Sequence, residues 1–284
     1  MHTIQSAIPD ARLRPFIRCF AQREISAQSS SVVESTMASL EHIASFRLGG
    51  QPTIDHCSGM STVVPDIHFF GTQTRSLGYF SFTGSVLTFG IFLKPFASWE
   101  LFRIPPAEFA DQTFVGREVF GPWITGLWQK LGECETFRDR VQLATETLLP
   151  FAGHATAQTA TMAAARSLLE VQSGMRIEHL ARASYMTVRS FERKFVRDIG
   201  VPPKLFGRLR RFQMALDRKR TSRTRWLDVA HDLGYFDQMH MVKEFRGFGG
   251  EAPNRLLQSC GDYQPWSIGE PLSLNTVTNH LKSE

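Results

Sequence analysis

The feature that most constrains the fold is an internal repeat in the C-terminal half of the chain. Residues 180–206 (LARASYMTVRSFERKFVRDIGVPPKLF) resemble residues 229–257 (VAHDLGYFDQMHMVKEFRGFGGEAPNRLL). Self-similarity at one offset predicts a supersecondary unit that is used twice. Four anchor positions agree in order: Ala181 with Ala230 at an offset of 49, and Phe195 with Phe245, Gly200 with Gly250 and Pro203 with Pro253 at an offset of 50.

Each copy of the repeat reads as a short helix, a turn and a second helix that ends at Gly-x-x-Pro. In the second copy, Gly234 ends the first helix. The small Ala181 and Ala230 permit close approach of the next helix, as a helix-turn-helix requires. Asp237 in the second copy, and Thr187 in the first, are placed to cap the second helix by accepting from free backbone N–H groups at its start. The repeat therefore predicts two helix-turn-helix units.

Apolar spacing assigns a buried and an exposed face to these helices. The first helix of the second copy has a stripe made of Leu227, Ala230 and Leu233. The predicted buried faces of the second helices are Phe191, Phe195 and Ile199 in copy one, and Met241, Phe245 and Phe248 in copy two. The predicted exposed faces are Arg189, Glu192, Arg193 and Arg197 in copy one, and Gln238, Met239, Val242, Lys243 and Arg246 in copy two. Arginine can bond guanine with both arms and glutamine can do so with adenine, so these faces suit the major groove.

The spacing between the two copies favours binding to one face of a DNA duplex. Residues 203–219 carry an amphipathic helical pattern, and seventeen helical residues extend ~25 Å. Such a spacer could hold two reading helices roughly one DNA turn apart, ~34 Å. Basic side chains in and after this spacer would add sequence-independent affinity for phosphates: Arg208, Arg210, Arg211, Lys219, Arg220 and Arg223.

The charge of the chain is concentrated in the same region. Residues 157–262 hold 19 Lys and Arg against 11 Asp and Glu, whereas residues 1–156 hold 12 against 14. Such asymmetry indicates a module that binds a polyanion, joined to a part with another role.

With these residues in place, residues 157–262 resemble the DNA-binding domain of the AraC family of transcription regulators. The family's late signature, I-A-x-x-x-G-F/Y-x-D-Q-S-H-F-x-R-x-F followed by G-x-x-P, is matched by Val229-Ala230, Gly234-Tyr235, Asp237-Gln238, His240, Phe245, Gly250 and Pro253. The sequence departs from it with Met239 for serine, Met241 for phenylalanine, Val242 for a small polar residue and Lys243 for arginine. The resemblance implies two helix-turn-helix units joined by a long helix.

The resemblance also implies which residues meet double-stranded promoter DNA through second helices at about 187–198 and 237–247. The implied base readers are Arg189, Arg193, Gln238, Met239 and Lys243. The expected contacts to the DNA backbone are Thr187, Arg197, Arg208, Arg211, His240 and Arg246. RNA polymerase is a further candidate partner of such a regulator.

The first hundred residues favour strands, separated by Gly, Pro and Asp: 17–24, 38–48, 65–71, 77–83 and 85–93. This spacing predicts an antiparallel barrel or sandwich. Helical spacing follows at 95–103, 121–133 and 135–151. The expected fold class is α+β, with an antiparallel β-barrel or sandwich and helices at 1–152, an all-α DNA-binding domain at 157–262 and an irregular tail at 263–284.

The N-terminal half resembles, more weakly, the β-rich sensor domains that precede this module in the family. The resemblance rests on residues 13–18 (LRPFIR), 90–95 (GIFLKP) and 101–111 (LFRIPPAEFAD). It implies a cupin-like barrel with a ligand pocket or a dimer surface. The expected partners of this half are therefore a small-molecule effector and a second copy of the chain, in a homodimer.

Several side chains in the N-terminal half leave alternatives open. A pocket lined by part of its phenylalanines could use His42, Arg47 or His68 as polar contacts, although most phenylalanines should be core. Trp123, Leu127 and Leu131 fit either the core or a dimer seam. A metal cupin normally offers an H-x-H pair, which this chain lacks, and His240 lacks convergent partners, so neither metal nor cofactor is expected.

The remaining features favour a regulator in the cytoplasm. The chain has no apolar run near the ~20 residues of a membrane span. Its four cysteines form no C-x-x-C pair, which suits free thiols in a reducing compartment. The common nucleophile, P-loop, zincin and dinucleotide motifs are absent, so no catalytic residue is proposed. Two alternatives remain: a cupin-like enzyme with a vestigial basic tail, and a ligand-independent regulator whose barrel is only a dimerisation scaffold.

Overall fold

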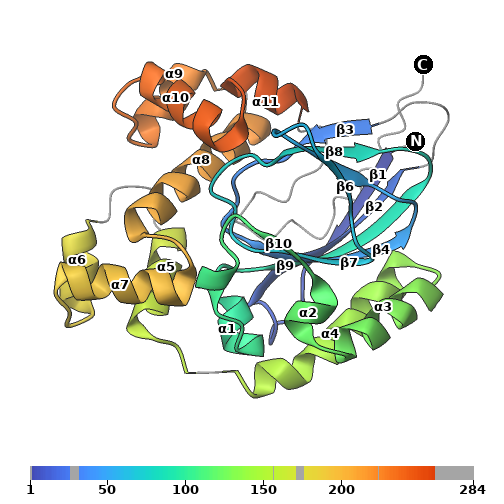
Figure 1. Ribbon diagram of the computed structural model, residues 1–284. Coiled ribbons are helices and arrows are strands. Elements are labelled where there is room, and N and C mark those ends of the chain that lie inside the picture. Colours follow the sequence, from blue (N-terminus) through green and yellow to red (C-terminus); the bar gives the residue numbers. More distant parts are fainter. Residues whose placement is uncertain (1, 26–31, 156, 171–175, 223, 260–284) are drawn as a thin grey trace.

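The computed structural model describes residues 2–25, 32–155, 157–170, 176–222 and 224–259 (Figure 1). The predicted tail at 263–284, together with Cys260 and Arg223, lies outside the described residues. Among the described residues, no helix is both long and apolar enough to cross a membrane.

The N-terminal half is built from two antiparallel sheets that lie opposite one another (Figure 1). One sheet has the order β1-β2-β9-β4-β7-β10 and the other β3-β8-β5-β6. The described strands are β1 (His2–Ala7), β2 (Ile17–Ile25), β3 (Val32–Ser35), β4 (His42–Gly49), β5 (Thr53–His56), β6 (Ser61–Val63), β7 (Ile67–Phe70), β8 (Gly78–Phe82), β9 (Val86–Leu93) and β10 (Thr113–Val115). The predicted α+β class with β-rich N-terminal and all-helical C-terminal parts is confirmed, with the expected barrel realised as two sheets.

All five predicted strand segments contain a strand of the structure, and five strands were missed. The missed strands are β1, β3, β5, β6 and β10. Four of these, β3, β5, β6 and β10, have only three or four residues, and β6 is wholly exposed. Three of them, β3, β5 and β10, pair with a strand far along the chain, for example Thr113 of β10 opposite Phe70 of β7. A short strand of this kind is stabilised by its neighbour and carries little periodicity of its own.

Helices cover the outer face of the six-stranded sheet (Figure 1). They are α1 (Ala97–Phe102), α2 (Gly116–Phe120), α3 (Trp123–Glu133) and α4 (Phe137–Gly153), with a 3-10 turn η1 (Pro106–Glu108). Phe46, Phe69 and Phe89 are fully buried beneath them in one cluster with Leu127 and Leu131 of α3. The open choice between core and dimer seam is thereby settled for these two leucines: both are core.

His42 fastens α1 to the sheet. Its Nδ1 lies 3.0 Å from Ser98 Oγ on α1, and its Nε2 lies 3.2 Å from Thr72 Oγ1 after β7. Both partners are buried hydroxyls, so the neutral ring can bond to each without a nearby counter-charge. Burial lowers the pKa of His42 to about 4.

The C-terminal half is helical and packs directly on the sheets. Its helices are α5 (Ala160–Glu170), α6 (Ile177–Ala183), α7 (Val188–Ile199), α8 (Pro203–Thr221), α9 (Trp226–Asp232), α10 (Gln238–Gly249) and α11 (Pro253–Ser259). Met37, Ala38, Leu40 and Phe96 of the β-rich half belong to the same buried cluster as the helical core. The Arg166 guanidinium pairs with Glu100 at 2.8 Å and lies 4.0 Å from the centre of the Phe96 ring.

A glycine allows a close approach between the two halves. Gly200 has φ of +92°, and a Cβ at this position would lie 2.8 Å from the backbone oxygen of Pro106 in η1. Any side chain here would meet both backbone strain and a clash with an immobile carbonyl. Gly200 therefore ends α7 and also seats it against the β-rich half.

The buried state of His42 predicts acid sensitivity of the fold. The folded pKa of about 4 lies below the ordinary value of 6.5, so between these values the unfolded chain binds more protons and acid favours unfolding. We expect the difference in unfolding free energy between the natural chain and His42→Gln to shrink by about 2 kcal/mol from pH 7 to pH 5. Urea titrations at the two pH values measure it. The exposed His231→Gln is the control, and equal behaviour of the two variants would contradict the expectation.

Candidate nucleic-acid interface and a cavity between the sheets

The two predicted helix-turn-helix units are present, and their turns share a backbone hydrogen bond and a positive φ at the same position. In the first unit, Met186 N–H donates to Ala181 C=O at 2.9 Å; in the second, Tyr235 N–H donates to Ala230 C=O at 2.9 Å. The turn residue before each donor has a positive φ, 53° at Tyr185 and 69° at Gly234. The repeat in the sequence therefore corresponds to a repeat in backbone geometry.

The ends of the second helices, α7 and α10, are held as expected. Thr187 Oγ1 accepts from Ser190 N–H at 3.2 Å, and Asp237 Oδ1 accepts from His240 N–H at 2.6 Å. Both helices stop at a left-handed glycine, Gly200 and Gly250. Such caps satisfy backbone groups that a helix end would otherwise leave without partners.

The expected buried faces of α7 and α10 are confirmed, whereas the expected stripe on α9 is partly wrong. The six side chains predicted to point inward are all buried. Leu227, however, is 54% exposed, and Trp226 with Val229 takes the inward position. The indole of Trp226 packs 5.3 Å from the Phe245 ring and donates to Asn254 Oδ1 at 2.6 Å. This ring turns α9 so that Leu227 faces outward.

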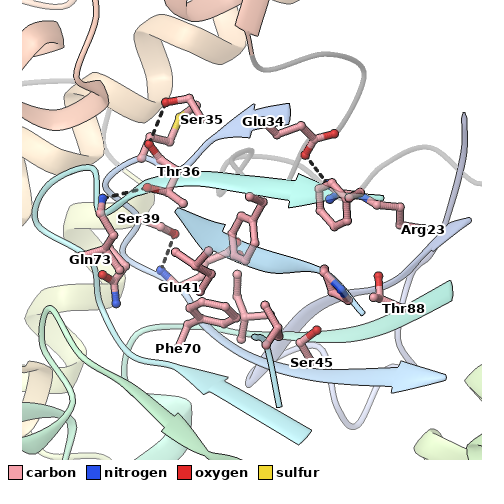
Figure 2. A pocket seen from close by; sticks show the side chains of 18 of the residues that line it. Arg23, Glu34, Ser35, Thr36, Ser39, Glu41, Ser45, Phe70, Gln73 and Thr88 are labelled. Carbon is pink, nitrogen blue, oxygen red and sulfur yellow. Dashed lines mark hydrogen bonds and ion pairs between the residues drawn. The ribbon is translucent and has the colours of Figure 1, made fainter. Parts of the chain in front are cut away.

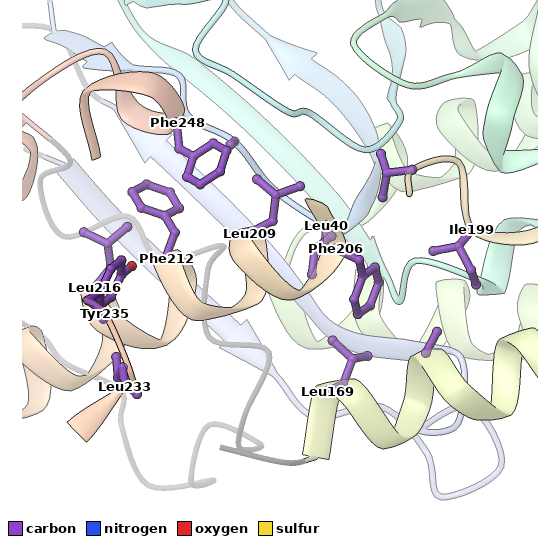
Figure 3. Packing of buried hydrophobic residues seen from close by; sticks show 14 of the residues in the cluster. Leu40, Leu169, Ile199, Phe206, Leu209, Phe212, Leu216, Leu233, Tyr235 and Phe248 are labelled. Atoms are coloured by element: carbon purple, nitrogen blue, oxygen red, sulfur yellow. The ribbon is translucent and has the colours of Figure 1, made fainter. Parts of the chain in front are cut away.

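Long apolar packing along α8 joins the two units (Figure 3). Phe206 contacts Phe195 of α7, with ring centres 5.6 Å apart, and Phe212 contacts Phe245 of α10 at 4.8 Å. Leu209, between them, is fully buried. The expected connecting helix at 203–219 is thus confirmed as a 19-residue helix that contacts both α7 and α10.

The side chains expected to read bases lie on the exposed faces of α7 and α10. Arg189, Arg193, Gln238 and Lys243 are exposed, and Met239 is 72% exposed. Among the expected backbone contacts, Thr187, Arg197 and Arg246 are also exposed. Arg197 forms an ion pair with the neighbouring Asp198 at 2.7 Å.

A concave groove of about 940 Å³ runs along α8 between the two units. Three of the expected backbone contacts, Arg208, Arg211 and His240, line it. The basic side chains in its lining are Arg176, Lys204, Arg208, Arg210, Arg211 and His240, and the acidic ones are Glu178 and Glu244. The structure thereby brings together residues from both units in one positively charged depression.

Glu244 organises this groove, and the sequence reasoning missed it. Its carboxylate is 4% exposed and accepts from Arg208 Nε at 2.7 Å and from Arg211 Nη2 at 3.3 Å. His240 Nε2 lies 3.6 Å away. The guanidinium of Arg211 also lies 4.4 Å from the Tyr235 ring. Glu244 sits at the inner edge of α10, one residue after a predicted base reader, and no motif marked it.

Arg210 does not fit the phosphate-binding role expected from the sequence. It is buried, and its Nε and Nη2 donate to the carbonyl of Leu169 at 3.1 and 2.7 Å. Burial lowers the pKa of this guanidinium. Arg210 therefore holds the end of α5 against α8. Lys219 is similarly engaged, since its Nζ donates to the carbonyl of Thr224 at 2.6 Å.

A cavity of about 120 Å³ lies between the two sheets (Figure 2). Its apolar lining includes Ile43, Ile54, Phe70, Phe80 and Phe82. Its polar lining includes Arg23, Glu34, Ser39, Glu41, Ser45, Gln73 and Thr88. None of the three side chains proposed from the sequence as pocket contacts, His42, Arg47 and His68, lines it.

Each of these three side chains is used elsewhere. His42 faces α1, on the opposite side of β4 from Ile43 and Ser45. Arg47 forms an ion pair with Asp66 and donates to Gly50 O at 2.6 Å. His68 is buried 4.0 Å from the Phe70 ring, and burial lowers its pKa to about 4. A histidine beside an aromatic strand is a weak sequence signal, because strand register decides which face it occupies.

The charges that do line the cavity are paired. Arg23 Nη2 donates to Glu34 Oε2 at 2.6 Å, and Arg18 donates to Glu41 Oε2 at 3.0 Å. Burial raises the pKa of both carboxyls, and the neighbouring arginine opposes that shift in each case. Among the described residues, no group of three His, Cys, Asp or Glu side chains is placed to hold a metal ion.

Comparison with known proteins identifies parts of the chain. Residues 180–259 match a family model described as a helix-turn-helix domain, and residues 5–114 match a domain of unknown function (DUF6597). No curated protein matches the chain. The fold is similar to that of apo ToxT from Vibrio cholerae strain SCE256, with a TM-score of 0.50 at 8% identity, over 89% of this chain and 100% of that one.

Two further solved structures match. ToxT from Vibrio cholerae O395 gives a TM-score of 0.48 at 8% identity, over 92% of this chain and 99% of that one. The DNA-binding domain of AdpA, solved in complex with a target DNA, gives 0.33 at 23% identity, over 36% of this chain and 93% of that one. The match at residues 180–259 covers both helix-turn-helix units of the structure.

Proposed function

We propose that the chain is a sequence-specific regulator that reads promoter DNA with α7 and α10. The observation that carries this proposal is the pair of equivalent reading helices, each with an exposed polar face, joined by one continuous helix. A 19-residue helix spans ~28 Å, close to the ~34 Å between successive major-groove segments on one side of a duplex.

Within this proposal, the two helices read bases by different chemistry. Arg189 and Arg193 on α7 offer guanidinium forks for guanine. On α10, Gln238 can recognise adenine, while Met239 offers apolar contact of the kind that suits a thymine methyl group. Lys243 can also donate to guanine, but its ammonium group is less directional than the guanidinium group of an arginine. The first unit would then supply more of the sequence discrimination than the second.

Phosphate contacts would come from the groove and from the rims of both helices. Arg208 is oriented by Glu244, and Arg211 by Glu244 and by the carbonyl of Gly234, so both guanidinium groups are held in place before DNA arrives. Thr187, Arg197, His240 and Arg246 lie at the ends of α7 and α10, where the duplex backbone would pass. These contacts position the protein but carry no sequence information.

The β-rich half, residues 1–152, would control the DNA-binding half, residues 157–262, through a small-molecule effector. The cavity between the sheets supports this role, because it is accessible and the charged side chains in its wall are paired. A homodimer formed through the same half, with its sheets as a scaffold only, is the competing arrangement. Substitutions that fill the cavity would leave such a scaffold unaffected.

Substitution of reading arginines tests the proposal directly. A DNA site is first selected from random sequences with the full chain, and fluorescence anisotropy then measures its dissociation constant. Arg193→Ala is expected to cost about 1–3 kcal/mol and to relax preference at one position of the site. Arg246→Ala should weaken binding to all sequences and reduce the salt slope by about 1. The exposed Arg12→Ala in the β-rich half is the charge-matched control. Equal losses in all three variants would exclude base reading by α7.

The N-cap of α10 provides an independent prediction. Asp237→Ala leaves the first backbone N–H groups of α10 without an acceptor and should lower the unfolding free energy by about 1 kcal/mol. Asp237→Asn keeps an accepting oxygen and should retain that stability. Chemical denaturation measures both, and anisotropy should show weaker DNA binding for Asp237→Ala than for Asp237→Asn. If the two variants bind DNA equally while differing in stability, α10 contributes little to binding.

A further inference from the structure

The cavity between the sheets has no net charge to offer a ligand. Its cationic side chain, Arg23, is paired with Glu34 and lies 4.6 Å from the Phe82 ring. Its second carboxylate, Glu41, is paired with Arg18. A charged molecule entering this space would lose its hydration and find each opposite charge already committed. The cost of burying an unpaired charge therefore selects an uncharged occupant.

The cavity wall includes an uncharged polar side chain, Gln73, whose amide oxygen could accept from a ligand. Gln73 is only 6% exposed, and its Nε2 donates to the carbonyls of Gly71 and Gln112, both at 3.2 Å. These two bonds fix which end of the amide is the nitrogen. Its Oε1 is buried and has no hydrogen-bond partner among the described residues. A buried acceptor in this state is stabilised by an O–H or N–H donor from an occupant.

The size and the walls of the cavity limit what that occupant can be. The space of about 120 Å³ is comparable with cavities of ~150 Å³ that take up benzene. Three aromatic rings form part of the wall, with Phe70 and Phe80 at 5.8 Å and Phe80 and Phe82 at 6.0 Å. Flat apolar walls and this volume suit a single ring, and exclude a long acyl chain or a sugar with many hydroxyls.

The same glutamine is connected to the second reading helix through the backbone. Gln73 and Ser39 exchange two N–H···O=C bonds, each 2.8 Å. Figure 2 shows Ser39 beside Gln73 on one side of the cavity, with Arg23 and Glu34 on the other. One residue before Ser39, the N–H of Ala38 donates to the carbonyl of Phe248, in the last turn of α10, at 2.8 Å.

Residues 36–41, which we name the bridging segment, send some side chains into the cavity and others into the core of the helical half. Ser39 and Glu41 line the cavity, whereas Ala38 and Leu40 are buried in the core of the helical half. Met37 belongs to both sets. Side chains of this one segment therefore enter both the cavity and the core of the helical half, so a single thickness of backbone separates the two.

From this geometry we infer that the cavity binds an uncharged, single-ring molecule that donates a hydrogen bond to Gln73 Oε1, and that the bridging segment carries its presence to α10. The ligand inference stands on the cavity alone, and the transmission rests on the proposed DNA-binding function. The binding and DNA measurements are therefore made separately on the full chain.

Three probes of similar size test the ligand class: phenol, which has a ring and a donor; toluene, which replaces the hydroxyl by a methyl group; and benzoate, which is charged. Ligand-detected NMR gives their dissociation constants. Benzoate is expected to bind at least ~10-fold more weakly than phenol. Benzoate binding as tight as phenol, or no phenol binding to a folded chain, overturns the inference.

Gln73→Leu tests the acceptor. Toluene binding should persist, while the ratio of phenol affinity to toluene affinity should fall by roughly 5- to 10-fold. Gln142→Leu, an exposed substitution on α4, is the matched control and should leave that ratio unchanged. Because the ratio is measured within one variant, a general loss of stability does not imitate the effect. An unchanged ratio in Gln73→Leu excludes the assigned hydrogen bond.

Leu40→Ala tests the transmission. In the natural chain, saturating phenol should change the affinity for the selected DNA site by ~5-fold or more, and DNA should change phenol affinity by the same factor. Leu40→Ala should keep phenol binding within about threefold but lose this coupling, because the core contact of the bridging segment is removed. Phenol binding without coupling in the natural chain overturns the transmission. Phenol binding by a chain that selects no DNA site contradicts the proposed function instead.

Discussion

Burial of the apolar face of α8 is the constraint on which the rest of the helical half depends. Phe206 and Phe212 receive one aromatic side chain from each reading helix, at 5.6 and 4.8 Å, and Leu209 between them is fully buried. Interiors packed this densely resist small displacements. The separation of α7 and α10, and their rotation relative to one another, are therefore set by α8. Loss of either aromatic contact would free a reading helix from its counterpart.

The same core extends into the β-rich half, so the two halves are not independent. Leu40 and Phe96 are buried among residues of α5, α7 and α8, and Arg166 pairs with Glu100 across the boundary. The bridging segment is placed so that a change on the cavity side has a direct route to the carboxyl end of α10. A DNA-binding unit attached only by a flexible linker would have no such route.

Much of the helical half could be predicted because its signals are local. Caps, glycine stops and apolar spacing act over three or four residues, and apolar spacing located α8 to within about two residues. The bounds implied by the family resemblance for α7 and α10 agree equally closely. The three side chains proposed from the sequence as pocket contacts do not line the cavity between the sheets, because strand register decides which face a side chain occupies. Gln73 carries no motif, and its importance comes from backbone pairing with Ser39 and from carbonyls near residues 71 and 112.

The sequence by itself determined the repeated helix-turn-helix and its buried and exposed faces, because those properties follow from periodicity within single helices. Only the tertiary structure decided that Glu244 orients Arg208 and Arg211, that Arg210 is a structural residue, and that the cavity lies beside Gln73 and not beside His42. These outcomes depend on which residues from distant segments meet, and burial then decides the charge and hydrogen bonding of each. Local sequence patterns do not encode such contacts between distant segments.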